Sequence, residues 1–191
     1  DIDSAGGIDV AAGETGYAVL DLEPGEWYVG IGDTNPFTPL TVTGDAAATP
    51  VTLPDPPADV TVELRDRVVD LPDQIPAGRT VWHATNVGHQ PHFLTLVKTA
   101  KLLTVEQVQT LAGLPEGGTP PPGVPDPATV EVLPVELRNL SPGREVWVEL
   151  DLAPGYYAAL CSIADPATGL PHVLLGEVDV FTVGEPGTAT A

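Results

Sequence analysis

The sequence predicts an all-β sandwich, and three observations support that fold class. Short apolar runs rich in Val, Thr and Leu recur along the chain, and many of them alternate apolar with polar residues. The 22 Pro and 20 Gly residues fall largely between these runs, where turns are required. A segment with the order strand, Pro-Gly turn, strand occurs twice. With 42% hydrophobic residues, the 191-residue chain can also bury a substantial core.

Eight strands are expected after Ala58, and together they account for the sandwich. Each combines β-branched or aromatic residues with a turn signal at its end. The expected strands are Val60–Leu64, Arg67–Leu71, Arg79–Asn86, Phe93–Lys98, Val130–Leu137, Glu145–Leu152, Tyr156–Cys161 and Val178–Val183.

One helix is expected between the fourth and fifth of these strands. Thr104 is placed to cap its N-terminus, and Gln107 three residues on completes a capping box. Gly113 ends the run. The apolar positions that form one face, able to lie on the sandwich, are Val105, Val108 and Leu111.

Three segments carry side chains that bind metals. Asn86–His92 ends one strand and opens the next through a Pro-His pair, Tyr156–Cys161 is a strand that ends in the one cysteine, and Pro171–Glu177 leads into the last strand. This order resembles that of the plastocyanin/azurin-type cupredoxins, the small blue copper proteins. The resemblance implies a Greek-key β-sandwich over about residues 58–184.

The resemblance also implies a metal centre. Its ligands would be His92, Cys161 and His172, with Glu177 at the place of the family's axial Met, and its metal would be copper. Two imidazoles and a thiolate suit both oxidation states of copper. Two features depart from the family: ten residues separate Cys161 from His172, and the chain has no Met. A carboxylate is a harder donor that favours Cu(II) and lowers the potential, or shifts the preference toward zinc.

Each candidate ligand also has a structural interpretation. A lone Cys161 at the end of an apolar strand can be a buried small hydrophobe, and His92 beside a Pro can be a surface residue. Glu177 can be a solvent-facing strand residue. Of the other histidines, His83 is expected to be structural because it lies in mid-strand, and His89 is expected in a loop near the mouth of the site.

An internal repeat divides the chain. Gly13–Tyr28 matches Gly143–Ala158 at a constant offset of 130 residues (143 − 13), and each copy turns at a Pro-Gly pair. Only the second copy has enough chain before it to complete a sandwich. The predicted division is residues 1–45, a partial cupredoxin-like β-repeat without metal ligands; residues 46–57, a Pro-rich linker; residues 58–184, the cupredoxin-like domain; and residues 185–191, a flexible tail.

Charge and missing motifs exclude several functions. Seven basic residues against 27 acidic ones give a net charge of −20, which excludes nucleic acid as a partner. No apolar run is long enough to span a bilayer. There is no phosphate-binding loop, nucleophile–base pair or carboxylate pair, so the chain is not predicted to be an enzyme. It begins at Asp1 without an initiator Met, so we expect a processed chain that is secreted or on the cell surface.

Two functions stay open. The first is a secreted cupredoxin-like protein that binds one copper ion for electron transfer or copper handling, with a redox partner protein. The alternative is a non-catalytic structural module of a surface layer, a filament or a larger complex, with the fold but without metal. The N-terminal strands should be covered by the main domain or by a neighbouring chain, giving in the second case a homo-oligomer or filament. No transition metal should bind within residues 1–57, because no His precedes His83.

Overall fold

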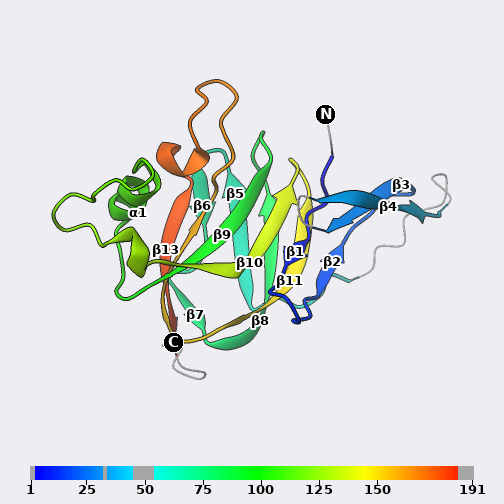
Figure 1. Cartoon of the computed structure of the whole chain (residues 1–191). Coiled ribbons are helices and arrows are strands. Elements are labelled where there is room, and N and C mark those ends of the chain that lie inside the picture. The colour runs from blue at the N-terminus through cyan, green and yellow to red at the C-terminus, as the bar shows by residue number, and fades with distance from the viewer. Residues whose placement is uncertain (1–2, 32–33, 45–53, 185–191) are drawn as a thin grey trace.

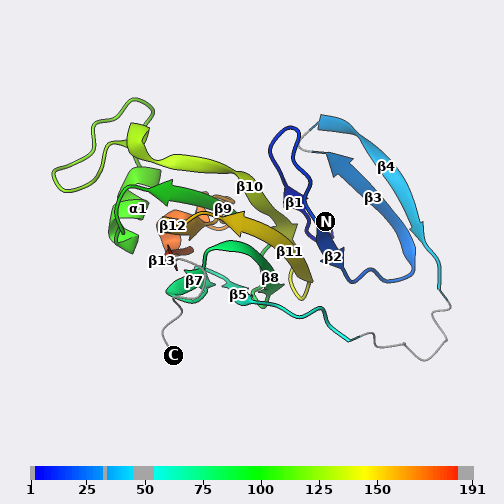
Figure 2. The ribbon, with the colours of Figure 1, turned by 90° about the horizontal axis from the view of Figure 1, so that it is seen from below.

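Two β-sheets packed against one another form the body of the protein (Figures 1 and 2). This computed structural model describes residues 3–31, 34–44 and 54–184. The first sheet has the order β1 (Ile8–Asp9), β10 (Glu131–Leu140), β9 (His92–Thr99), β12 (Gly155–Leu160), β13 (Val178–Gly184) and β7 (Gln74–Pro76). The second has the order β2 (Ala18–Leu20), β11 (Glu145–Leu152), β8 (Gly78–Asn86), β5 (Val60–Arg65) and β6 (Val68–Asp70). A separate hairpin joins β3 (Gly25–Ile31) to β4 (Thr34–Val42).

Alternation along the strands builds the core between the sheets. In β5 the buried side chains are every second residue, so one face of the strand is apolar and the other meets solvent. Trp82 of β8 meets Phe181 of β13 edge to face, with ring centroids 5.9 Å apart. Both rings are almost fully buried, and they join the two sheets at the centre of the molecule.

The order of the strands is that of a Greek key. The chain crosses between the sheets several times, and β5 pairs with β8, and β13 with β7, in parallel. The other pairs among the described strands are antiparallel. The predicted fold class, an all-β Greek-key cupredoxin-like β-sandwich with one short helix, is confirmed.

The second expected strand differs from the prediction. Arg67–Leu71 was expected as one strand, but β6 ends at Asp70 and a further short strand, β7, follows in the other sheet. Arg67 has a φ of 70°, a left-handed turn conformation, so the strand begins after it. Pro72 then interrupts the pairing, since it cannot donate to a ladder, and the chain crosses between the sheets.

The helix α1 (Val105–Ala112) begins and ends as predicted. Thr104 and Gln107 make both hydrogen bonds of the capping box, and Gly113 is the C-cap. The helix packs its apolar residues over a second, smaller core with Val173 and Val178. Two 3-10 turns, Pro127–Thr129 and His172–Leu175, were not predicted. Within the described residues no helix combines the length and the apolar character needed to cross a membrane.

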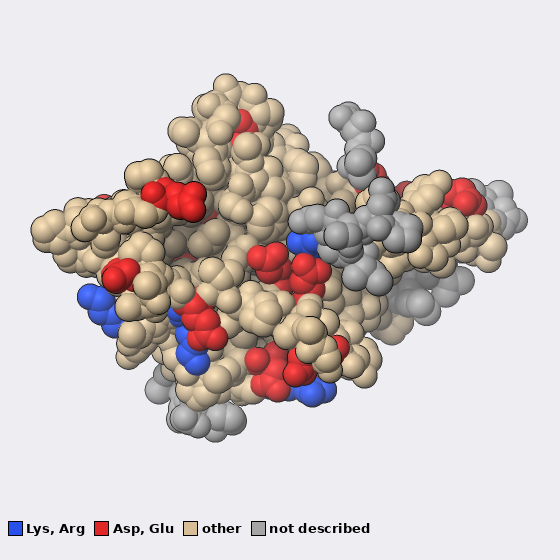
Figure 3. Space-filling model, viewed as in Figure 1, with Lys and Arg blue, Asp and Glu red and all other residues tan. Residues whose placement is uncertain are grey.

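The N-terminal segment lies beside the main sandwich (Figure 2). Strand β1 pairs with β10 at the edge of one sheet, and β2 pairs with β11 at the edge of the other. The β3–β4 hairpin projects away from the sandwich (Figures 1 and 3). The domain boundaries stay a prediction, and residues 46–53 of the predicted linker and the predicted tail lie outside the described residues.

Candidate metal centre

The four predicted ligands lie together at one end of the sandwich. His92 is the first residue of β9, Cys161 directly follows β12, His172 opens the 3-10 turn, and Glu177 directly precedes β13. One donor atom from each lies within 4.8 Å of the others. None of the four is more than 1% exposed. Residues that are far apart in the sequence therefore present one thiol, two imidazoles and one carboxyl group to a common point.

The carboxyl group of Glu177 lies between the two imidazoles. Its Oε1 is 2.7 Å from Nδ1 of His92, and its Oε2 is 2.7 Å from Nδ1 of His172. The Sγ of Cys161 is 3.6 Å from the same Nδ1 of His172. Glu177 is therefore a member of the cluster and not the solvent-facing residue that the sequence left open.

The close contacts of Glu177 with the two imidazoles do not have the geometry of hydrogen bonds, unlike the contact between Cys161 and His172. In the described part of the chain, both carboxylate oxygens of Glu177 and both ring nitrogens of His92 are buried atoms without a hydrogen-bond partner. Unsatisfied buried polar atoms are costly, and a buried carboxylate especially so. Donor atoms that face a shared point instead of one another are what a bound cation requires, so the residues present fit a metal ion.

Backbone hydrogen bonds connect the segments that carry three of the ligands. Val173 N–H donates to the carbonyl of Cys161 at 2.7 Å, and Cys161 N–H donates to the carbonyl of Glu177 at 3.2 Å. Glu177 N–H donates in turn to the carbonyl of His172 at 3.0 Å. This chain of bonds fixes the three segments relative to one another without any metal.

A glycine allows the last of these segments to turn. Gly176 has a φ of +116°, in the region that favours glycine, directly before Glu177. A Cβ at this position would lie 2.9 Å from the carbonyl oxygen of Arg67. Another residue at position 176 would therefore strain the backbone and displace Glu177.

The long loop between Cys161 and His172 is braced from inside. Asp165 Oδ1 accepts hydrogen bonds from the N–H groups of Ala167 and Thr168, and Asp165 N–H donates to the carbonyl of Leu170. Asp165 is itself buried. Hydrogen bonds from Gln90 and then from Thr168 lower the pKa of Asp165 to about 2, so it is a carboxylate at neutral pH.

Gln90 connects this loop to His172. Its Nε2 donates to Oδ2 of Asp165 at 3.1 Å, and its Oε1 lies 2.9 Å from Nε2 of His172. A carboxylate only accepts hydrogen bonds, so the amide nitrogen of Gln90 must face Asp165 and the amide oxygen must face the imidazole. His172 then carries its proton on Nε2, which leaves the lone pair of Nδ1 directed at the cluster.

Asp66 holds the turn before His92. Its Oδ1 accepts from the N–H groups of His89 and Gln90 and lies 3.5 Å from Nε2 of His92. Although burial acts to raise it, these bonds and the His89 imidazole lower the pKa of Asp66 overall. Gly88 makes room for this approach, since a Cβ there would lie 2.6 Å from Oδ1 of Asp66.

The thiol of Cys161 is protonated before any metal binds. Burial, and then the charge of Glu177, raise the pKa of Cys161 to about 12. A metal that binds the thiolate must therefore displace a proton, which makes binding stronger at higher pH.

The other two histidines are outside the cluster. The imidazole of His83 stacks on Trp147, with ring centroids 4.1 Å apart, and its Nε2 lies 2.8 Å from Glu145. It is structural, as predicted. His89 lies in the turn before His92, and its side chain is 92% exposed. The roles of Gln90, Asp66 and Asp165 were not predicted, although Gln90 stands within the His89–His92 segment that the sequence singled out.

The sandwich has a cupredoxin-like fold, and the buried His-Cys-His-Glu cluster lies at one end of it. No family model and no curated protein matches the chain. Among solved structures, an auracyanin from the photosynthetic bacterium Roseiflexus castenholzii is 21% identical with a TM-score of 0.40, covering 65% of this chain and 94% of that one. Auracyanin B is 23% identical with a TM-score of 0.37, covering 70% and 95%. A multi-copper oxidase from Pediococcus acidilactici is 11% identical with a TM-score of 0.35, covering 78% and 30%.

Proposed function

We propose that this protein binds one copper ion through His92, Cys161, His172 and Glu177 and acts as a one-electron carrier. The observation that supports this most is the cluster itself: four buried donor atoms within 4.8 Å of one another, with the carboxylate oxygens of Glu177 free of hydrogen bonds. The donor set, two imidazoles with one thiolate and one further ligand, is one that suits copper. A bound copper ion would supply one-electron chemistry by alternating between Cu(II) and Cu(I).

The chain's own residues provide what an electron carrier requires. The backbone hydrogen bonds among Cys161, His172 and Glu177 hold the ligands in place, so little rearrangement should accompany a change of charge. Burial excludes water and competing ligands from the site. Glu177 adds a second anionic donor beside Cys161, which favours Cu(II) and lowers the potential relative to a site with a thioether.

The test is a Cu(II) titration of the metal-free protein, followed by absorption spectroscopy. The wild-type protein should take up one equivalent and develop a thiolate-to-copper charge-transfer band. The variant Cys161→Ser should lose the band, because no other cysteine is present. His83→Gln, which changes a histidine outside the cluster, should retain it. The absence of the band, or a band that survives Cys161→Ser, would contradict the proposal.

A second function, assembly, is favoured by a different observation. The β3–β4 hairpin exposes large apolar side chains, among them Tyr28 at 68% and Phe37 at 59%. Such a surface is typical of a contact with another polypeptide. An electron carrier also requires a redox partner. The net charge of −20, with acidic groups outnumbering basic ones on the face in Figure 3, favours a partner with basic groups. A secreted or cell-surface location, predicted from the sequence, is part of this proposal.

A further inference from the structure

The N-terminal copy of the repeat folds as the second copy does. β3 pairs with β4 so that Gly25 faces Val42, and β12 pairs with β13 so that Gly155, the counterpart of Gly25, faces Val183. In both turns a side chain donates a hydrogen bond to the backbone carbonyl four residues earlier in the sequence. Trp27 donates from Nε1 to the carbonyl of Glu23 at 2.9 Å, and its counterpart Tyr157 donates from its hydroxyl to the carbonyl of Ala153 at 2.6 Å. The sequence repeat is therefore also a structural repeat.

The two copies contact each other symmetrically. In the antiparallel pair of β2 and β11, Ala18 faces Val148, which is its own counterpart at the offset of 130 residues. β1 and β10 show the same relation: Ile8 is the counterpart of Arg138, and it faces the adjacent Leu137. Antiparallel strands that pair about equivalent residues are related by a local two-fold axis. The N-terminal segment is thus placed as part of a second sandwich, with β1, β2, β3 and β4 in the roles of β10, β11, β12 and β13.

Among the described strands, the N-terminal copy has no counterparts of β5 to β9, and the position of the β9 counterpart lies between two of its own strands. In the main domain β9 lies between β10 and β12 and pairs with both. Its place in the N-terminal copy is between β1 and β3. Among the described strands, β3 pairs with β4 and no strand lies between β1 and β3. Consequently, no described strand pairs through backbone hydrogen bonds with the edges of β1 and β3 that would face a β9 counterpart.

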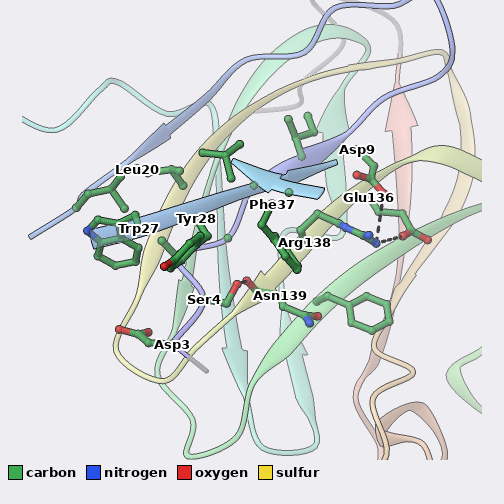
Figure 4. Close-up of a pocket in the computed structure, with 18 of the residues that line it drawn as sticks. Asp3, Ser4, Asp9, Leu20, Trp27, Tyr28, Phe37, Glu136, Arg138 and Asn139 are labelled. Carbon is green, nitrogen blue, oxygen red and sulfur yellow. Dashed lines mark hydrogen bonds and ion pairs between the residues drawn. The ribbon is translucent and has the colours of Figure 1, made fainter. Parts of the chain in front are cut away.

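A large cavity lies at this position (Figure 4). It has a volume of about 970 Å³ and is lined on one side by the segment that contains β1, on another by β3, and by β9 and β10 of the main sheet. Its walls include apolar side chains such as Trp27 and Phe37. Its charged lining residues are four carboxylates and one guanidinium: Asp3, Asp9, Glu26, Glu136 and Arg138. Arg138 pairs with Asp9 and Glu136, and Asp3 pairs with Arg144, so the negative charge of the lining is partly compensated but still in excess beside an apolar surface.

The exposure of the side chains shows that the inner face of the N-terminal copy is uncovered. Val29 of β3 is 52% exposed, whereas its counterpart Ala159 in β12 is fully buried. Leu40 of β4 is 41% exposed, whereas its counterpart Phe181 in β13 is 1% exposed. The same structural unit thus has its inner face covered in the main domain and open in the N-terminal copy.

We propose that the cavity between β1 and β3, here called the acceptor groove, binds one extended strand of a partner polypeptide. The strand takes the place of a β9 counterpart and runs antiparallel to both β1 and β3. Its backbone joins the two edges, and apolar side chains at alternate positions cover Trp27 and Val29. The carboxylates of the groove select a strand with net positive charge.

The test uses the full chain without metal and a fluorescent peptide with the sequence Phe93–Lys101. This peptide has the alternating pattern of β9 and two lysines, and it contains no histidine. Fluorescence anisotropy should show saturable binding. A second peptide carries N-methyl groups on the backbone nitrogens of Leu94 and Val97, so it lacks one N–H donor on each of its two edges. It should bind at least tenfold more weakly. This comparison separates strand pairing from general apolar contact.

Two matched variants locate the site. Val29→Asp places a carboxylate in the acceptor groove and should weaken binding at least tenfold. Val132→Asp changes a similarly exposed strand residue outside the groove and should leave binding unchanged. Absence of saturable binding, or equal binding to wild type and Val29→Asp, would overturn the proposal. So would self-association of the chain that Val29→Asp abolishes, since a second copy would then be the occupant. These results do not depend on copper.

Discussion

At the scale of single residues, Gln90 is the group that orients a proposed ligand without binding metal itself. It holds Nε2 of His172 with its amide oxygen and is held by Asp165 in turn. Second-sphere partners of this kind typically change metal affinity about 10- to 100-fold when they are removed. Replacement of Gln90 by Ala should therefore weaken Cu(II) binding in that range.

Competition with a chromophoric chelator would measure this loss, and the shape of the thiolate-to-copper band would report the freedom of His172. Gln74→Ala, which removes an exposed glutamine from β7, is the matched control and should leave both unchanged. If Gln90→Ala and Gln74→Ala have the same affinity as the wild type, Gln90 has no positioning role.

Asp165 should make the stability of the metal-free protein depend on pH. Hydrogen bonds, first from Gln90, lower its pKa from the ordinary 3.8 to about 2 in the folded state. A carboxyl group with a lowered pKa stabilises the fold above its unfolded pKa, and this contribution is lost as the pH falls toward 2. Asp165→Asn should lower the thermal midpoint at pH 6 and reduce the further drop between about pH 4 and pH 2.

Thermal unfolding followed by circular dichroism across this pH range is the measurement. Glu116→Gln, in an exposed loop, is the control and should follow the wild type. A pH profile of Asp165→Asn that is parallel to that of the wild type would show that the loop does not depend on this carboxylate.

That His92, Cys161, His172 and Glu177 would lie together could be predicted from the sequence, because their order along the chain resembles that of a known family. The contacts that position them could not. Gln90 meets His172 across 82 residues, and it meets Asp165 across 75. These contacts depend on where a ten-residue loop returns, and no local pattern encodes that path. The burial of Glu177 could not be predicted either. Glu177 directly precedes β13, and the alternation of residues within that strand does not determine whether the residue before it is buried.

At the scale of elements, α1 contributes to the second core and contacts the segment that carries His172. The helix lies over the 3-10 turn of His172, and Gln109 Nε2 donates to the carbonyl of Val173. Thr104→Ala removes the side-chain cap and should lower the free energy of unfolding by about 1 kcal/mol. Chemical denaturation would measure it.

Thr110→Ala is a suitable comparison within the same helix. The hydroxyl of Thr110 bonds back to the carbonyl of Glu106, an interaction that adds little to helix stability. This variant should be neutral or slightly more stable than the wild type. If Thr104→Ala and Thr110→Ala lower the free energy of unfolding equally, the helix cap is not the contribution of Thr104 to stability.

Long alternating strands and a capped helix could be predicted because their own residues specify them. The shortest elements could not. β1 has two residues and β7 has three, and each exists because the edge of an existing sheet pairs with it. The 3-10 turn of His172 likewise follows from the bonds that hold Val173 and Glu177, and not from its own propensity.

At the scale of the whole molecule, β1 and β2 cover edges of the main sandwich that would otherwise be open. Because both contacts are symmetric, a chain that lacks residues 1–57 should replace them with the same edges of a second copy. We expect a homodimer in which two β11 strands pair about Val148. Sedimentation equilibrium would give twice the mass of the truncated chain.

A proline can test this pairing without disturbing the sheet. Glu149 N–H donates to the carbonyl of Tyr17, the residue directly before β2, and therefore points away from β8. Glu149→Pro in the truncated chain removes that donor, so the dimer should dissociate to folded monomers. A truncated chain that is monomeric without this change would show that the symmetric register does not by itself support association.

The internal repeat also allows an incorrect strand pairing during folding. Two hairpin corners of similar sequence lie on one chain, and either could pair with β8 before the other arrives. The copies differ where the choice matters: Val146 and Val148 of β11, both fully or nearly buried, correspond to Gly16 and Ala18. A misplaced first copy would leave voids in the core, so the correct copy gains more apolar burial and dominates at equilibrium. Gly16 and Ala18 thus prevent the first copy from replacing the second copy beside β8.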